Sequence, residues 1–306
     1  MARFWFWKRK KAQLPANLIM EGSPARFEYF GGRRFVSEVP YALPKDSGEI
    51  QRLDFQHFLL KYGLQGNFLA PIEQPLSILD VGCGTGRWAM ELAQQFPNAK
   101  VIGVDLVPTE HFTTGYGLIK PPDNYTFVKG NAMEGLSFAD DSFDFVHQRL
   151  LVAALPRDRW LPVVRELARV TRPGGWVELA ECGSPQDNPS NPYPRLWDTW
   201  IAFCQTRGID FTIGKSIGAM LQQAALRQVQ QHEVLFPMGK WGGRVGVMSG
   251  EDCLAVGKAL RAGVVAAGIV SAEQYDALLE GTTAQFSRPT GQSILSFYIA
   301  YGQKGR

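Results

Sequence analysis

A glycine-rich turn between an apolar run and an amphipathic segment constrains the fold more than any other feature. From Ser77 the chain reads SILDVGCGTGRWAMELA, with glycines at the alternate positions 82, 84 and 86. Glycine adopts positive φ and has no Cβ, so a ligand can lie against bare backbone. The helix that follows offers unpaired N–H groups and a partial positive charge. The segment therefore predicts a ligand-binding turn at the carboxyl edge of a parallel sheet.

Short apolar runs alternate with helical patterns through the middle of the chain. Strands this apolar, separated by helices, indicate a parallel sheet covered on both faces. The predicted strands are 77–82, 99–106, 125–131, 143–149 and 175–181, followed later by 232–238 and 293–303. We therefore predict an α/β fold with a seven-stranded, mostly parallel sheet and helices on both faces.

The remaining segments predict a helical lid and two insertions. Residues 1–40 are expected to form an irregular basic and aromatic extension with one hairpin around 27–39. Residues 41–306 are expected to form one domain with core motifs at 77–181 and acceptor-side insertions at 183–231 and 239–292. Helices are predicted at 49–64, 87–96, 157–170, 195–207, 216–231, 250–268 and 271–285.

Charge is concentrated at the start of the chain. The first twelve residues hold five of the 32 Lys and Arg and none of the 29 Asp and Glu, so the remainder is nearly neutral. A near-neutral body does not indicate a nucleic-acid partner. The Phe4–Trp7 cluster followed by Lys8–Lys11 could contact an anionic membrane, but a short tail packing on its own domain is the favoured interpretation.

Cysteine usage and hydropathy exclude several classes. The four cysteines stand far apart without a C-x-x-C pair, which disfavours a zinc site or a disulfide framework. No apolar stretch approaches the ~20 residues of a membrane span, and the N-terminus lacks a signal-peptide core. We predict a cytoplasmic protein without a metal site.

The glycine spacing separates two ligand classes. A dinucleotide fold uses G-x-G-x-x-G, whereas this turn is G-x-G-x-G preceded by Asp80. The pattern favours a ligand with an amino-acid tail, whose carboxylate suits helix N–H groups and whose ammonium suits Asp80. Asp105 ends the next strand, where a carboxylate can accept both ribose hydroxyls. An NAD-dependent oxidoreductase, and a purely structural turn with a capping aspartate, are the alternatives.

Four segments resemble the motif series of class I S-adenosylmethionine-dependent methyltransferases, which have a Rossmann-like sheet. In chain order they are ILDVGCGTGRWAMELA, VIGVDL, VKGNAMEGLSFADDSFDFVHQR and RVTRPGGWVELAE. The upstream YALPKDSGEIQRLDFQH and the terminal YGQKGR further resemble the LaeA-like branch of that family.

The resemblance implies a cofactor and its contacts. S-adenosylmethionine (SAM) would be held at its methionine tail by Asp80, Gly82 and Gly84, and at its ribose by Asp105. The resemblance also implies that Leu106, Asn131, Ala132 and Met133 surround the adenine and that Gln148 lies near the sulfonium. Tyr41 would form a lid together with the helix that bears Arg52, Gln56 and His57. Plain packing and capping is the alternative for Tyr41 and His57.

Methyl transfer from a sulfonium requires alignment and exclusion of water rather than a metal or a covalent nucleophile. His147 and Arg149, at the end of the fourth predicted strand, are the candidate catalytic residues. His147 is able to move a proton near neutral pH, provided that it faces the pocket rather than a helix layer. Arg149 could instead pair with an acceptor carboxylate or with a structural acid such as Glu181.

Aromatic residues are abundant in the predicted insertions. These aromatic residues are Tyr193, Trp197, Trp200, Phe203, Phe211 and Trp241. They would form an apolar pocket for a small acceptor. Alternatively, they join the insertions to the core. We predict methyl transfer to a small hydrophobic or aromatic metabolite. A SAM-binding regulatory protein and a protein methyltransferase are the alternatives, and the acceptor atom and oligomeric state stay open.

Overall fold

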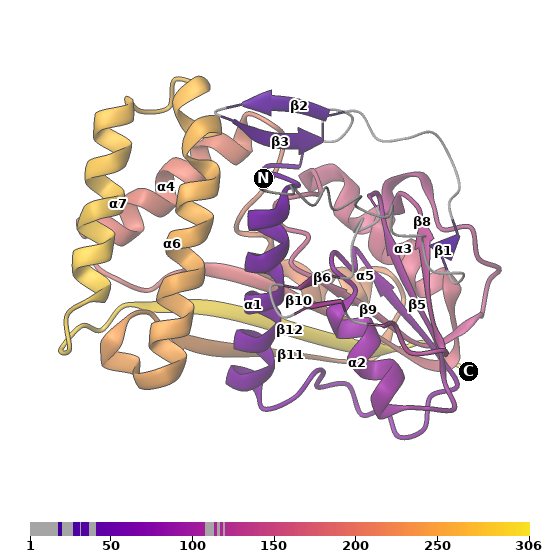
Figure 1. Ribbon diagram of the computed structural model, residues 1–306. Coiled ribbons are helices and arrows are strands. Elements are labelled where there is room, and N and C mark those ends of the chain that lie inside the picture. Colours follow the sequence, from indigo (N-terminus) through magenta and orange to yellow (C-terminus); the bar gives the residue numbers. More distant parts are fainter. Residues whose placement is uncertain are drawn as a thin grey trace, which may run out of the picture.

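A twisted central sheet organises the molecule (Figure 1). The computed structural model describes residues 18–19, 27–30, 32–36, 41–107, 113–114, 117–118 and 120–306. Within them the strand order is β1-β8-β5-β4-β9-β10-β12-β11. The strands are β1 (Leu18–Ile19), β4 (Ser77–Val81), β5 (Lys100–Asp105), β8 (Tyr125–Lys129), β9 (Phe143–Arg149), β10 (Thr171–Pro185), β11 (Arg227–Pro237) and β12 (Ile294–Gln303).

The strand directions confirm the predicted mostly parallel sheet. β4 pairs in parallel with β5 and β9, and β8 and β10 extend this parallel region. β12 runs antiparallel to both neighbours, β10 and β11. All seven predicted strands are present. The two-residue β1, which pairs with β8, was not predicted, because two residues carry no readable periodicity.

Side chains alternate along the strands and so contribute to two apolar layers, one on each face of the sheet. Ile78 and Phe145 point to the face covered by α2 (Arg87–Gln95), where Trp88 is buried with them. Leu79 and Val146 point to the opposite face, which α3 (Trp160–Val170) covers. Because both faces are buried, the strands carry almost continuous apolar sequence.

A layer of three helices stands at one end of the sheet (Figure 1). α4 (Pro192–Gln205) comes between β10 and β11, together with η3 (Ile213–Ser216) and α5 (Ile217–Gln223). After β11 come η4 (Lys240–Gly242), α6 (Gly243–Ala266) and α7 (Ala272–Phe286). α4, α6 and α7 pack on one another, and α1 (Ser47–Leu64) packs on α6.

Two helix predictions were wrong. The helix predicted over 216–231 ends at Gln223, and β11 begins at Arg227 because this polar stretch pairs with β12 as an edge strand. The helix predicted over 250–268 begins earlier, because α6 starts at Gly243 rather than at Gly250. A Cβ at Gly246 would lie 2.2 Å from the Gly239 carbonyl oxygen, so the glycines allow close backbone packing.

The predicted N-terminal hairpin is present as β2 (Phe27–Phe30) and β3 (Arg33–Val36), with Gly32 at φ 75° in its turn. The basic and aromatic cluster at residues 4–11 lies outside the described residues. Two further short strands, β6 (Thr113–Thr114) and β7 (Gly117–Leu118), form a separate pair.

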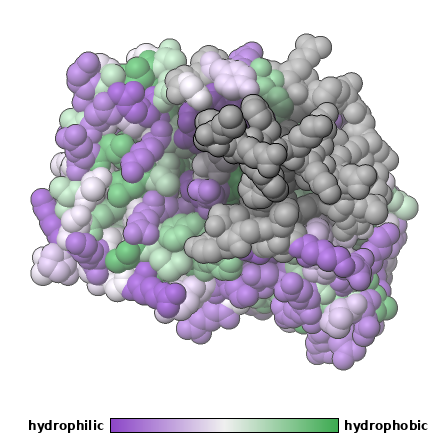
Figure 2. Space-filling view, in the orientation of Figure 1, coloured by the Kyte–Doolittle hydropathy of each residue, from purple (hydrophilic) through white to green (hydrophobic). Residues whose placement is uncertain are grey.

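The surface mixes residues of different hydropathy. Figure 2 shows hydrophilic and hydrophobic residues interspersed over the described part of one face. No helix within the described ranges combines the length and apolarity needed to cross a bilayer.

Candidate active site

A cavity of about 250 Å³ opens at the carboxyl edge of the sheet. The ends of β4, β5 and β9 and the turn after β8 line one part of it, and α1 covers that part. α4, α6 and β12 line the other part. The cavity therefore joins the glycine-rich turn to the helical insertions, at the edge where open α/β sheets bind ligands.

The glycine turn is closed on one side and open on the other. Gly82, Gly84 and Gly86 have φ values of 70°, 55° and 73°. A Cβ at Gly82 would lie 2.5 Å from Leu151, whereas a Cβ at Gly84 would meet only Leu53, at 3.7 Å. The bare backbone at position 84 thus faces the cavity side of the turn, as a ligand cradle requires.

Asp105 lies beside this turn and contacts it directly. Its Oδ2 accepts a hydrogen bond from the Gly84 N–H at 2.9 Å, and its Oδ1 accepts one from the Val107 N–H at 3.2 Å. Lys45 Nζ lies 3.4 Å from Oδ1. Burial alone would lower the pKa of Lys45, but the facing Asp105 carboxylate raises it to about 12. Lys45 is a site residue that the sequence analysis missed.

The segment that carries Lys45 is held in place from both sides. The Ala42 N–H donates to the Ala153 carbonyl at 3.0 Å, and the Lys45 N–H donates to the Arg34 carbonyl at 2.6 Å. Asp46 pairs with Arg33 of β3 (Nη2 to Oδ1, 2.9 Å) and caps α1. The hairpin and the loop after β9 therefore fix residues 41–46 over the part of the cavity that contains Asp105.

Tyr41 and the residues predicted to surround the adenine line one part of the cavity. Burial raises the pKa of Tyr41 to about 12, and its ring lies 5.6 Å from Lys45 Nζ. Asn131 uses its side-chain oxygen to accept the Met133 N–H at 3.1 Å, which shapes the turn η1 (Ala132–Glu134). Cavity-lining residues on this side are Tyr41, Leu106, Asn131, Ala132 and Met133.

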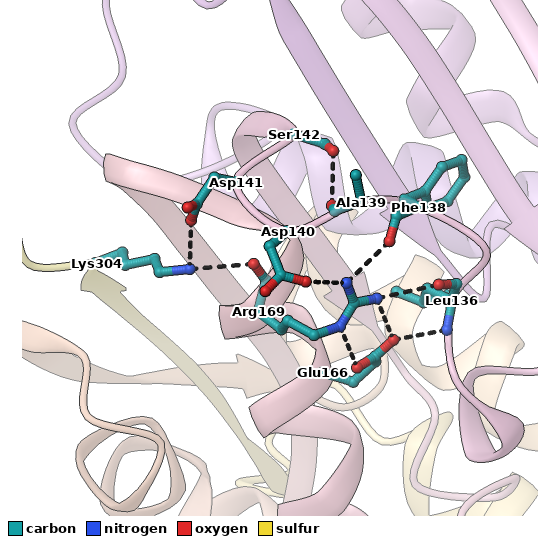
Figure 3. A network of polar contacts seen from close by, with 9 residues as sticks. All are labelled: Leu136, Phe138, Ala139, Asp140, Asp141, Ser142, Glu166, Arg169 and Lys304. Atoms are coloured by element: carbon teal, nitrogen blue, oxygen red, sulfur yellow. Dashed lines mark hydrogen bonds and ion pairs between the residues drawn. The ribbon is translucent and has the colours of Figure 1, made fainter.

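A polar network fixes the loop after η1 (Figure 3). Arg169 of α3 donates to the carbonyl oxygens of Leu136 and Phe138 at 3.1 and 2.9 Å. It also contacts Asp140 at 2.6 Å, and Glu166 accepts the Leu136 N–H at 2.7 Å. The loop between the adenine side and β9 is therefore anchored to α3.

Charged residues connect α1 to α6. Arg52 contacts Glu49 at 2.7 Å on its own helix and Asp252 at 2.8 Å on α6. Gln56 donates to the other Asp252 oxygen at 2.8 Å. Both Arg52 and Glu49 are buried, so this network holds the predicted lid helix against the acceptor-side insertion.

His57 and Arg149 meet beneath α1. Arg149 Nη2 lies 3.2 Å from His57 Nδ1, and His57 Nε2 lies 3.1 Å from Glu91. Burial lowers the pKa of His57, which favours the neutral ring. Burial opposes ionisation of Glu91, but His57 and Lys61 lower its pKa to about 2. A neutral His57 can donate to Glu91 while it accepts from Arg149.

His147 faces the cavity side of the sheet rather than the α3 face. Its Nδ1 lies 2.8 Å from Asp80 Oδ1, and its ring stacks on Trp88 with centroids 3.8 Å apart. Burial lowers the pKa of His147. A carboxylate at Nδ1 favours the tautomer with hydrogen on that nitrogen, which leaves the Nε2 lone pair available.

Gln148 is placed differently from the prediction. Side chains alternate along β9, so Gln148 points to the α3 face while its neighbours His147 and Arg149 line the cavity. It is fully buried, and its amide atoms have no hydrogen-bond partner among the described residues. Every other predicted site residue lines the cavity.

The insertion aromatics divide between the two expected roles. Trp197, Trp200 and Phe211 line the cavity, together with Phe236 and Phe297. Tyr193 and Phe203 are buried in the helical layer without lining it, and Trp241 donates its indole N–H to Met238 and Ser293 carbonyls. The described residues contain no group of three or more His, Cys, Asp or Glu placed to hold a metal ion. All four cysteines are free.

Comparison with known proteins agrees with this geometry. Residues 78–175 match the family described as a methyltransferase domain. The N-methyltransferase sirN of Leptosphaeria maculans is 30% identical over 224 residues, covering 70% of this chain and 76% of that protein. The chain belongs to the class I SAM-dependent methyltransferases. Its cofactor is therefore SAM.

A second relative is named as a regulator. The secondary metabolism regulator LAE1 of Cochliobolus heterostrophus is 29% identical over 227 residues, covering 70% of this chain and 69% of that protein. The relatives of this chain thus include both a named methyltransferase and a named regulator.

Solved structures share the methyltransferase fold. A putative methyltransferase from an antibiotic biosynthesis pathway of Anabaena variabilis gives a TM-score of 0.53 at 18% identity, covering 84% of this chain and all of that one. The chain spans 62% of the length of an N-methyltransferase 2 from Haemonchus contortus (16% identity, 89% of this chain, TM-score 0.49).

β10 carries two buried acids that do not line the cavity. Glu181 accepts the backbone N–H groups of Leu151 and Val152 at 2.9 and 3.1 Å, and no ion pair joins it to Arg149 within the described chain. Burial raises the pKa of Glu181 to about 8. Glu178 similarly accepts the Leu69 and Ala70 N–H groups, and burial raises its pKa to about 7.

Glu181 predicts a pH-dependent stability. Because its pKa is higher in the folded chain than the ordinary value of 4.5, its contribution is complete below that value and is lost as the pH rises towards 8. The free energy of unfolding should fall by about 1 kcal/mol per pH unit in this window. The free energy of unfolding, measured with urea at several pH values, should depend less steeply on pH in Glu181→Gln than in the parent. An unchanged slope would exclude Glu181 as the titrating group.

Proposed function

We propose that the chain transfers the methyl group of SAM to a small, largely apolar metabolite that carries a ring. The observation that carries this proposal is the continuity of one cavity. The glycine turn and Asp105 line its cofactor part, while Trp197, Trp200 and Phe211 line the part beyond. An apolar, aromatic wall with few polar groups suits a small hydrophobic ligand.

The reaction is an in-line displacement. A lone pair on the acceptor forms a bond to the methyl carbon as the carbon–sulfur bond breaks, and the sulfur keeps the bonding electrons. The products are the methylated acceptor and S-adenosylhomocysteine. The acceptor loses a proton if its attacking atom carries one. The chain contributes alignment of the two molecules and exclusion of water beneath α1.

In this proposal His147 receives that proton. Its Nε2 lone pair is available because Nδ1 is occupied by Asp80, which also stabilises the protonated ring. The pKa of His147 is lowered by burial, so the ring is neutral and able to accept a proton near pH 7. Stacking on Trp88 fixes the ring plane.

Methyl-labelled SAM, incubated with the purified chain and a cell extract, tests the proposal. We expect label in an organic-soluble product, and we expect excess S-adenosylhomocysteine to suppress it. The heat-inactivated chain is the control. Absence of label from small molecules, in the presence of demonstrated cofactor binding, would reject a metabolite acceptor.

A regulatory role is the second candidate, favoured by the similarity to LAE1, which is named as a regulator. In that role the chain binds SAM and acts through a partner or methylates a protein. The same experiment distinguishes the two candidates, because a protein acceptor would leave the label in a band on a denaturing gel. Cofactor binding with no label in any fraction would favour the non-catalytic form.

A further inference from the structure

The acceptor-side part of the cavity has mainly apolar walls, and most of its polar side chains are hydrogen-bonded within the protein. Trp200 donates its indole N–H to Tyr275 at 2.9 Å, and the Ser249 hydroxyl donates to the Val245 carbonyl at 2.9 Å. The indole N–H of Trp197 has no partner among the described residues, but its nitrogen is sealed inside the protein. A ligand in this part of the cavity therefore meets few polar side chains that are free to recognise it.

Gln56 of α1 carries a side-chain oxygen that is free. Gln56 lines the cavity, and its side-chain nitrogen donates to Asp252 Oδ2 of α6 at 2.8 Å. A carboxylate only accepts hydrogen bonds, so the NH2 group must face Asp252 and the amide oxygen must point elsewhere. No hydrogen bond to that oxygen is present within the described part of the chain. The oxygen is also not sealed inside the protein, unlike the fully buried amide of Gln148.

The position of Gln56 on α1 places it beside the acceptor-side part of the cavity. Arg52, Gln56 and Gly63 are spaced by four and seven residues, so they lie on one side of the helix. On this side Arg52 contacts Asp252 of α6. A Cβ at Gly63 would lie 2.4 Å from the ring of Phe236, which lines the cavity. Gln56 therefore lies between these two contacts, on the side of α1 that faces the helical insertions.

The amide of Gln56 is held in one orientation before a ligand binds. Asp252 accepts from Gln56 at one oxygen and from Arg52 at the other, at 2.8 Å each. Arg52 is in turn held by Glu49, 2.7 Å away on the same helix. A side chain that is already fixed in its binding orientation loses little conformational entropy when a ligand arrives. The free oxygen can therefore discriminate between ligands that carry a hydrogen-bond donor and ligands that do not.

We propose that Gln56 selects methyl acceptors that carry a hydroxyl or N–H group, by accepting a hydrogen bond from that group at its amide oxygen. The inference rests on the proposed function and narrows the class of substrate within it. A ligand without a donor would cover this oxygen and leave it unpaired, which costs free energy. A neutral amide is not a base, so Gln56 orients the acceptor and His147 keeps the role of receiving a proton.

Indole and benzofuran test this selection, because the two molecules have nearly the same shape and only indole carries an N–H group. Each is titrated calorimetrically into the S-adenosylhomocysteine-loaded parent, Gln56→Met, Gln56→Leu and Gln51→Met. Gln51 is the matched control position, since it is exposed on the same helix and does not line the cavity. We expect the parent and Gln51→Met to bind indole roughly 3- to 10-fold more tightly than benzofuran. Both Gln56 variants should bind the two compounds equally, with the affinity for benzofuran unchanged.

Equal affinities of the loaded parent for indole and benzofuran would overturn the proposal without any variant. A preference for indole that survives in the Gln56 variants would also overturn it, because another group would then provide the selection. Equal losses of indole and benzofuran binding in these variants would indicate a merely structural role and reject the proposal as well. A loaded parent that binds neither compound would instead reject the aromatic acceptor compartment, and with it the proposed function itself.

Discussion

Replacing Asp105 with alanine is expected to weaken binding of S-adenosylhomocysteine by roughly 100- to 1,000-fold. The carboxylate stands at the end of β5, where the resemblance to the family places the ribose, and two charge-assisted hydrogen bonds to its hydroxyls would be lost. Each is worth about 1.5–3 kcal/mol. Calorimetric titration measures the change. Lys45 would then face an empty position, which adds an unpaired buried cation.

Two further variants serve as controls for Asp105→Ala. Asp105→Asn keeps an oxygen for the Gly84 N–H, so it should preserve the turn while it removes the charge. Asp123→Ala removes a carboxylate of an exposed side chain and should bind as the parent. If Asp105→Ala bound S-adenosylhomocysteine as tightly as the parent, the cofactor site described above would be wrong.

Gly82→Ala should destabilise the fold by about 3 kcal/mol. At φ 70° an L-residue costs about 1–2 kcal/mol, and the new Cβ would overlap Leu151 at 2.5 Å, which adds about 1–3 kcal/mol of overpacking. The displaced Leu151 also lines the cavity, so cofactor binding should fail as well. Urea unfolding and calorimetric titration report the two effects separately.

Gly84→Ala is the matched comparison. A Cβ there would make only an ordinary contact with Leu53, so the loss of stability should be limited to about 1 kcal/mol of backbone strain. The methyl group would nevertheless occupy the cradle, and S-adenosylhomocysteine binding should be severely weakened. Equal stability losses for Gly82→Ala and Gly84→Ala would contradict the closed and open sides assigned to this turn.

Local sequence was sufficient to predict the core of the fold. β9 was predicted with its observed bounds, and it is buried along nearly its whole length. α2 differs from its prediction by one residue, since glycines precede it and Pro97 follows its end. The same glycine turn and the acid at position 105 located the cavity, because both follow directly from strand ends.

Long-range contacts account for what the sequence did not predict. Lys45 is one position in a polar lead-in, and only folding brings it to Asp105, 60 residues away. The resemblance placed Gln148 near the sulfonium, but the alternation of side chains along β9 turns it to the other face. The polar stretch at 227–231 has no strand character alone and becomes one by pairing with β12.

The ion network between α1 and α6 has a thermodynamic consequence. Arg52 ties the helix above the cofactor to a helix that walls the acceptor compartment, through partners 200 residues apart in sequence. A ligand that moves one of these helices must therefore also move the other helix. We therefore expect each substrate to change the affinity of the protein for the second one, and reciprocity requires the factor to be identical in both directions.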